Sequence, residues 1–233
     1  TLNSNNTTTV NNQNFSYAYL SNIEDWSAKV DVDWMPNPDH MVKFGIGDIY
    51  HTFTPGVNQF QFSQTGNSAL DTTFGAVKHY AHEVAAYLED DWTVNDKLKG
   101  NGGIHFSTFF VGDKQYSSLQ PRLSFRYLID QKSSFKMGYA KMGQFLHLLT
   151  NSGIGLPTDL WVPATEKIKP QFSDQIAAGY ARTFSDKFEV SLEGYYKTMD
   201  NLIEYKDGAS FFDNETDWQD KVHIGRGWSY GGE

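Results

Sequence analysis

The sequence predicts an all-β fold and, within that class, an antiparallel up-and-down transmembrane β-barrel of which this chain supplies about nine strands. Three observations support this prediction. Segments of roughly ten to fifteen residues alternate apolar and polar side chains, the connections between them are short and long in turn, and tryptophan stands at both ends of one apolar stripe.

Composition limits the function. The 233 residues carry a net charge of −9 and no cluster of Lys and Arg, which argues against binding to a nucleic-acid backbone. Cysteine is absent, so no disulfide or thiolate nucleophile is available. The mean hydropathy of −0.53 does not separate a soluble β-protein from a barrel wall, because the polar inner face of a barrel keeps this average low.

The first part of the chain predicts a polar entry, two strands and a long loop. Residues 1–20 are rich in Asn and Thr and predict a loop leading into a strand. Beyond them, apolar and polar residues alternate from Trp26 to Trp34, and aromatic ends of this kind are typical of the interfacial girdles of membrane barrels. Prolines at 36–39 predict a short turn, and the polar stretch 55–75 predicts the first long loop.

The middle of the chain predicts further strands, the clearest of which form a hairpin over 120–139. Leu123, Phe125, Tyr127, Phe135 and Tyr139 share its apolar face, which we expect to meet lipid, and a polar turn at 130–133 joins the two strands. Before it, residues 80–93 predict a strand, 94–97 a short turn, and 111–118 a longer connection.

The last part of the chain begins with an irregular stretch. Residues 144–169 combine proline and glycine with no alternation and predict a second long loop. Strands follow over 172–184 and 188–196 around a short turn at 185–187, and a polar connection covers 201–218. Short connections on one side and long ones on the other are the wiring of an outer-membrane barrel, whereas a Greek-key sandwich needs crossovers.

Several segments resemble a known family. The segments LQPRLSFRY (119–127), FLHLL (145–149), LPTDLWVP (156–163), IKPQ (168–171) and GRGWSYG (225–231) are similar to the barrel of TonB-dependent outer-membrane receptors, closest to the large Bacteroidetes type. The resemblance implies a barrel of about 22 strands around a plug. Residues 1–233 are therefore interpreted as an internal fragment of the barrel domain, with the plug domain, signal peptide and C-terminal strands not present.

The same resemblance implies a function and partners. We expect an active transporter of the bacterial outer membrane, in which loops capture a nutrient and TonB, acting through the absent plug segment, drives its import. Its partners would be TonB, outer-membrane lipid, the rest of the same barrel and plug, and a small-molecule, glycan or peptide substrate, with a surface lipoprotein left open. No cofactor and no enzyme activity are expected, and the alternative is a secreted β-sandwich carbohydrate-binding module.

Candidate substrate contacts lie in the second long loop. Phe145, His147, Asp159 and Trp161 are the candidates, because aromatic side chains in an irregular segment at a barrel mouth can stack on sugars. The same side chains also suit packing of the loop onto its neighbours, which is the preferred interpretation.

Charged residues on the polar faces are the second set of candidates. Arg122, Arg126, Glu189 and Glu193 are predicted to face the lumen and to contact the plug or water, with a substrate passage as the alternative. No metal site is expected, because His79 and His82 lie three residues apart and such residues point to opposite faces of a strand. No catalytic residue is predicted.

Overall fold

The computed structural model describes residues 2–10, 13–64, 67–74, 78–149, 160–184, 188–207 and 217–233. In this part of the chain, eleven strands form one antiparallel sheet in the order β1-β2-β3-β5-β6-β7-β8-β11-β12-β13, with β4 paired to β3. The predicted all-β, up-and-down fold class is confirmed.

The bounds of the elements follow the chain. The strands of the sheet are β1 (Leu2–Val10), β2 (Gln13–Asn37), β3 (His40–Gln64), β4 (Asn67–Phe74), β5 (His79–Thr93), β6 (Leu98–Val111), β7 (Lys114–Asp130), β8 (Ser133–Gln144), β11 (Gln171–Phe184), β12 (Phe188–Tyr205) and β13 (Val222–Gly232). The remaining elements are a hairpin of β9 (Leu146–Leu149) and β10 (Leu160–Pro163), and the 3₁₀ helix η1 (Trp218–Lys221).

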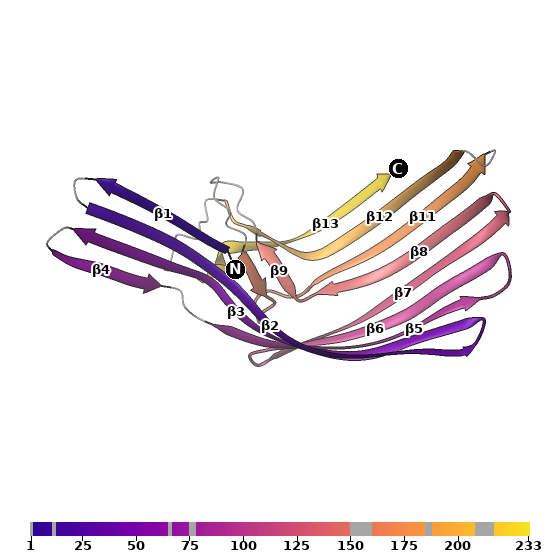
Figure 1. Cartoon of the computed structure of the whole chain (residues 1–233), viewed down its shortest axis with the longest axis horizontal. Coiled ribbons are helices and arrows are strands. Elements are labelled where there is room, and N and C mark those ends of the chain that lie inside the picture. Colours follow the sequence, from indigo (N-terminus) through magenta and orange to yellow (C-terminus); the bar gives the residue numbers. More distant parts are fainter. Residues whose placement is uncertain are drawn as a thin grey trace.

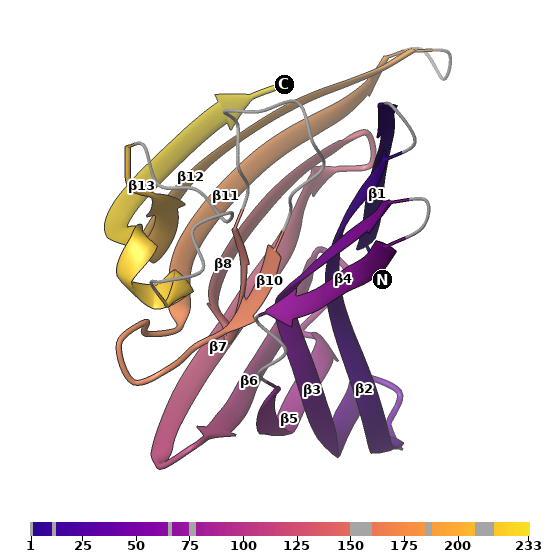
Figure 2. The ribbon, with the colours of Figure 1, turned by 90° about the vertical axis from the view of Figure 1, so that its left-hand side faces the viewer.

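The sheet curls into an open trough rather than lying flat (Figure 1). The β9–β10 hairpin lies inside this trough, on the concave side, as Figure 2 shows. No helix in the described part of the chain is long and apolar enough to cross a membrane.

Three predicted short turns are each stabilised by the side chain of an Asn or Asp at or near their start. Asn37 Oδ1 accepts from Asp39 N at 2.9 Å, Asn95 Oδ1 from Leu98 N at 2.9 Å, and Asp130 Oδ1 from Lys132 N at 2.7 Å. Asn and Asp form such turns because their short side chains reach the backbone two or three residues on. The predicted turn at 185–187 lies outside the described residues.

Five predicted loops are wrong in part. β12 extends to Tyr205 inside the predicted connection 201–218, and the β9–β10 hairpin lies inside the predicted loop 144–169. Residues 2–10 form β1, and the 55–75 stretch holds the end of β3 and all of β4, because pairing with a neighbouring strand overrides a polar composition. At 111–118 the connection is a tight turn in which Gly112 adopts φ 54°, a conformation that glycine reaches without strain. Without β1 and β4, nine strands of the sheet remain, which matches the predicted number.

The convex face carries the apolar stripes. Val30 lies beside Ile46, and the same row continues through Ala86, Phe106 and Leu119 on the next strands. Val30 is 64% exposed and Ile46 57%, and Trp26 and Trp34 at the ends of the stripe are equally open. A contiguous exposed apolar surface, with tryptophan at both ends of one stripe, is the surface that a barrel presents to lipid.

One acidic residue interrupts this face at its edge. Asp90 pairs in register with Val42, close to the short turns, and its Oδ2 lies 2.7 Å from His40 Nδ1. A carboxylate is tolerated on a lipid-facing stripe mainly near its end, and the position of Asp90 by the turn agrees with that rule.

Candidate functional site

The concave face carries the charged side chains and is the candidate functional surface. Lys29 and Asp31 lie on the opposite side of β2 from the apolar stripe. Lys29 Nζ pairs with Asp31 at 3.0 Å, and Tyr87 Oη donates to the same carboxylate at 2.7 Å. These charges are therefore balanced by neighbours within the wall.

Two acids of β5 share one donor on the adjacent strand. The side-chain amide of Asn101 donates to Glu89 at 2.8 Å and to Asp91 at 2.7 Å. Lys43 Nζ approaches Asp91 to 4.0 Å from the other side. Asn101 thus lets two carboxylates stand side by side on the wall, since each keeps a hydrogen bond.

A buried histidine forms a further polar group on this face. His51 is 3% exposed, and its Nδ1 lies 2.7 Å from Asp25 Oδ1 while its Nε2 lies 3.7 Å from Glu83 Oε2. Its ring packs against Phe53 and Phe109. Among the described residues, no group of three or more His, Asp or Glu side chains is arranged to hold a metal ion.

The residues of this group are far apart in the sequence and share no local motif. Asp25 and His51 are 26 residues apart, and their contact depends on the register of β2 with β3, which places them directly opposite each other. The alternating pattern does place His51 on the polar face of its strand, together with Lys43. The pattern does not, however, identify Asp25 as its partner.

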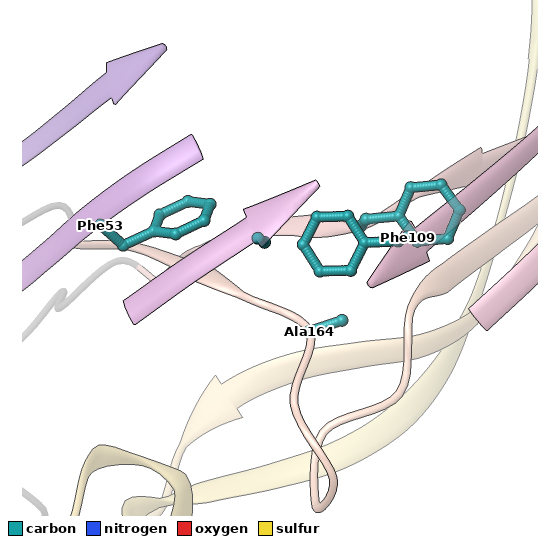
Figure 3. Packing of buried hydrophobic residues seen from close by; sticks show 5 residues of the cluster. Phe53, Phe109 and Ala164 are labelled. Carbon is teal, nitrogen blue, oxygen red and sulfur yellow. The ribbon is translucent and has the colours of Figure 1, made fainter. Parts of the chain in front are cut away.

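The β9–β10 hairpin closes one end of the trough through two hydrophobic clusters. The first cluster joins the start and end of the hairpin to β3, β5 and β6, and Phe145 stacks on Phe109 with ring centroids 5.1 Å apart and an interplanar angle of 2°. Figure 3 shows Phe53, Phe109 and Ala164 of this cluster. Its buried members are Phe53, Ala81, Phe109, Phe145 and Ala164.

The second cluster joins the same hairpin to β12 and β13, the last two strands of the sheet order. Its buried members are Leu149, Leu160, Val162, Ile168 and Val222, and residues of β12 pack against them. One hairpin therefore contacts strands that are far apart in the sheet order.

Polar contacts outside the membrane-facing part add to this attachment. Tyr116 Oη donates to the carbonyl of Thr165 at 2.6 Å, Lys114 pairs with Glu166 at 2.7 Å, and Lys167 pairs with Asp220 at 2.7 Å. The hydrogen bond from Lys114 lowers the pKa of the Glu166 carboxyl, and Asp220 raises the pKa of the Lys167 ammonium. Because both pairs are exposed to solvent, they add little to the stability of this attachment.

The predicted substrate contacts fall on different sides of the hairpin. Phe145 and His147 are buried, whereas the Trp161 side chain is 39% exposed. Asp159 lies outside the described residues. The hairpin thus brings Phe145 and His147 into its packed interior and leaves Trp161 accessible, and a role in substrate contact stays a prediction.

His147 is held in an unusual environment for a titratable group. Its side chain is fully buried, and neither ring nitrogen has a hydrogen-bond partner with good geometry. Burial lowers the pKa of His147 to about 4, and this effect outweighs the opposing influence of the Lys169 backbone. The imidazole is therefore neutral at pH 7.

The four predicted lumen residues lie along the concave wall. Arg126 and Glu193 line a hollow of about 550 Å³, and Arg122 lines a second one of about 490 Å³. Glu189 lies in register with Thr183, beside the short-turn end of β11 and β12. Their contact with a plug or with a substrate is a prediction that these positions leave open.

This geometry defines the class of the protein. One antiparallel sheet has an exposed apolar convex face with aromatic borders, a charged concave face, and tight turns at one end, which is the wall of an outer-membrane β-barrel. The model of the family described as TonB dependent receptor-like, beta-barrel, matches residues 1–233, so the chain belongs to this family and to the bacterial outer membrane.

Solved structures agree in fold. The copper transporter OprC gives a TM-score of 0.57 at 12% identity, with 94% of this chain and 38% of that chain covered. The FrpB iron transporter from Neisseria meningitidis (F3-3 variant) gives 0.56 at 10% identity, covering 94% and 37%. The RagAB peptide importer in the closed-closed state gives 0.54 at 9% identity, covering 82% and 25%.

These likenesses show the fold, and the chain spans well under half the length of each of these three proteins. None of the curated proteins compared with the sequence matches it.

Proposed function

We propose that this chain is part of an outer-membrane active transporter that captures a nutrient through its long connections and imports it with TonB-coupled energy. The observation that carries the proposal is the contrast between the two faces of one sheet. A lipid-facing convex surface and a charged concave surface with a hairpin folded into it suit a wall around a passage.

The alternative of a secreted β-sandwich fits this architecture poorly. A sandwich buries the apolar faces of two sheets against each other. Here the apolar stripe that includes Val30 and Ile46 is exposed, and the only other sheet in the described residues is a two-stranded hairpin on the opposite, concave side.

The class of substrate stays broad within the proposal. The three compared structures are named for copper, iron and peptide, so a small-molecule, glycan or peptide substrate is compatible with the family. TonB, the plug of the same polypeptide and outer-membrane lipid are the proposed partners, and a surface lipoprotein partner rests on the resemblance to the Bacteroidetes type alone.

Within this proposal the hairpin residues divide into two roles. Trp161 is the accessible aromatic ring and the preferred substrate contact. Phe145 and His147 hold the hairpin on the wall, since both are buried. An effect on uptake after Trp161→Ala, without a loss of folded protein, would support this division.

The test compares cells that lack the full-length gene with complemented cells. Growth is measured on a panel of limiting sources, namely copper salts, iron chelates, oligopeptides and glycans, in hosts with and without TonB. We expect a growth defect on one class, restored by the full-length gene only when TonB is present. Equal growth on every source, or restoration without TonB, would refute active transport by this route.

A further inference from the structure

An arginine lies on the convex face close to the short turns. Arg182 is on β11 and shares the exposed apolar side of that strand with Ile176 and Tyr180, since residues an even number of positions apart on a strand point the same way. In register it is opposite Ser133, the first residue of β8. Short turns lie on the periplasmic side of outer-membrane barrels, so Arg182 lies at the periplasmic border of the lipid-facing surface.

Aromatic rings surround Arg182 at this level. Its guanidinium carbon lies 5.2 Å from the centroid of the Phe184 ring. Tyr180 interacts with the same side chain, and Phe188, which is directly opposite Phe184, is 69% exposed. Rings of this kind form the interfacial girdle of a barrel. A guanidinium that lies over a ring can still donate through its edge, so Arg182 can stay at this depth and bind an oxygen ligand.

A carboxylate completes the polar part of this surface. Asp130 in the adjacent turn interacts electrostatically with Arg182, but the two charges are not joined in an ion pair within the described part of the chain. Asp130 Oδ1 accepts from Lys132 N at 2.7 Å, and a carboxylate has further acceptor sites. Near another short turn, by contrast, His40 and Asp90 lie 2.7 Å apart and satisfy each other. The surface around Arg182 therefore offers a positive and a negative charge side by side.

Apolar side chains next to Arg182 indicate the kind of ligand. Val190 is directly opposite Arg182 and 56% exposed, and Leu192, two residues further from the short turns, is 67% exposed. A ligand held at Arg182 thus has a polar part at the short turns and an apolar part along β12. This is the layout of a membrane lipid, whereas a soluble anion would leave the apolar part unused.

We propose that Arg182 and Asp130 form a binding site for the headgroup of a zwitterionic phospholipid in the periplasmic leaflet. The guanidinium donates to the phosphate oxygens, the carboxylate accepts from the primary ammonium group, and the acyl chains lie along Val190 and Leu192. A phospholipid with an anionic headgroup lacks the ammonium group and meets Asp130 as a like charge, so it binds less tightly. The site rests on the orientation of the wall in the membrane and does not depend on transport.

The test uses the full-length protein in detergent, with phosphatidylethanolamine and phosphatidylglycerol as probes. Native mass spectrometry measures the bound lipid, and Tm from tryptophan fluorescence measures its effect on stability. Arg182→Gln removes the positive charge, and Asp130→Asn removes the negative charge while keeping the oxygen that bonds to the turn. Arg226→Gln is the matched control, because Arg226 is an exposed arginine of the same face at the opposite end of the strands, where it pairs with Asp200 at 2.9 Å.

Two results together support the site. We expect the wild type and R226Q to bind phosphatidylethanolamine about tenfold more tightly than R182Q, which loses a charge-assisted hydrogen bond to the phosphate. Phosphatidylethanolamine should raise Tm in the wild type and in R226Q but not in R182Q. D130N should lose the preference for phosphatidylethanolamine over phosphatidylglycerol, because the carboxylate is the group that distinguishes the two headgroups.

Other outcomes overturn the proposal. Equal phosphatidylethanolamine binding by R182Q and the wild type, or an equal loss in R226Q, would show that Arg182 is not the phosphate ligand. A wild type that binds phosphatidylglycerol as tightly, or a D130N variant that keeps the preference, would remove the role of the carboxylate. If R182Q does not fold, the wild type is compared with phosphatidylethanolamine and with diacylglycerol, which lacks the headgroup, and equal binding of the two would overturn the site.

Discussion

Placing arginine at Val30 tests the orientation of the whole wall. Val30 is the centre of the convex stripe, four residues from Trp26 and four from Trp34. At about 3.3 Å per residue and a strand tilt of about 45°, each tryptophan lies roughly 9 Å in depth from Val30. If the two tryptophans mark the interfaces, Val30 lies at the midplane of the bilayer.

The expected cost follows from this depth. Arginine at the midplane of a lipid-facing strand destabilises an outer-membrane barrel by about 2–4 kcal/mol. The neighbours of Val30 offer no relief, because Ile46 is directly opposite it and the row continues through Ala86. We therefore expect Val30→Arg to lower the free energy of unfolding of the full-length protein by about 2–4 kcal/mol.

The control lies on the other face of the same strand. Ser27 is exposed on the concave side, within the hollow that Lys29 also lines, so Ser27→Arg places the same charge in water. Urea unfolding in phosphatidylcholine vesicles, followed by tryptophan fluorescence, compares the two variants. Equal losses, or a larger loss for Ser27→Arg, would refute the assignment of the convex face to lipid.

Three further predictions concern local packing. Gly45→Ala should destabilise the protein by about 1–3 kcal/mol, because its Cβ would lie 2.7 Å from the Tyr87 ring, while Gly225→Ala, with nothing within 4 Å, should be neutral in the same urea assay. Phe145→Ala should cost about 3–5 kcal/mol and raise protease cleavage of the hairpin, whereas Trp161→Ala should leave cleavage unchanged; equal cleavage would contradict the packing role. The pKa of His147 is about 4 in the folded protein, whereas an unperturbed histidine has a pKa of about 6.5, so its stabilising contribution is complete above pH 6.5 and falls by up to roughly 3 kcal/mol as pH drops towards 4; His147→Leu should therefore flatten the pH profile of unfolding in that window.

The alternation of side chains predicts the faces of the wall because it is a local property. A strand exposes successive residues to opposite sides, so Leu123, Phe125 and Tyr127 share a face whatever their neighbours are. The short turns are equally local, since Asn37, Asn95 and Asp130 each bond to backbone within three residues. The tight turn at Gly112 was missed because the polar residues after it suggest a longer connection.

Contacts between distant strands are not available from such patterns. The pairing of His51 with Asp25 depends on the register of β2 with β3, which sets residues from different strands opposite each other. The hairpin of β9 and β10 has no alternation in its sequence, and it forms because the wall offers buried apolar positions such as Phe109. For this reason, Phe145 and His147 are residue types that are common in binding loops, but both are buried like core residues.

The hairpin also determines how the two wings of the trough are held. A single sheet has no second layer to fix its curvature, and here one short hairpin packs on β3, β5 and β6 through one cluster and on β12 and β13 through the other. Because Phe145 belongs to the first cluster and Leu149 to the second, displacement of the hairpin would expose both clusters together. If Trp161 contacts substrate, as proposed above, the substrate meets a segment whose displacement is coupled to the shape of the wall.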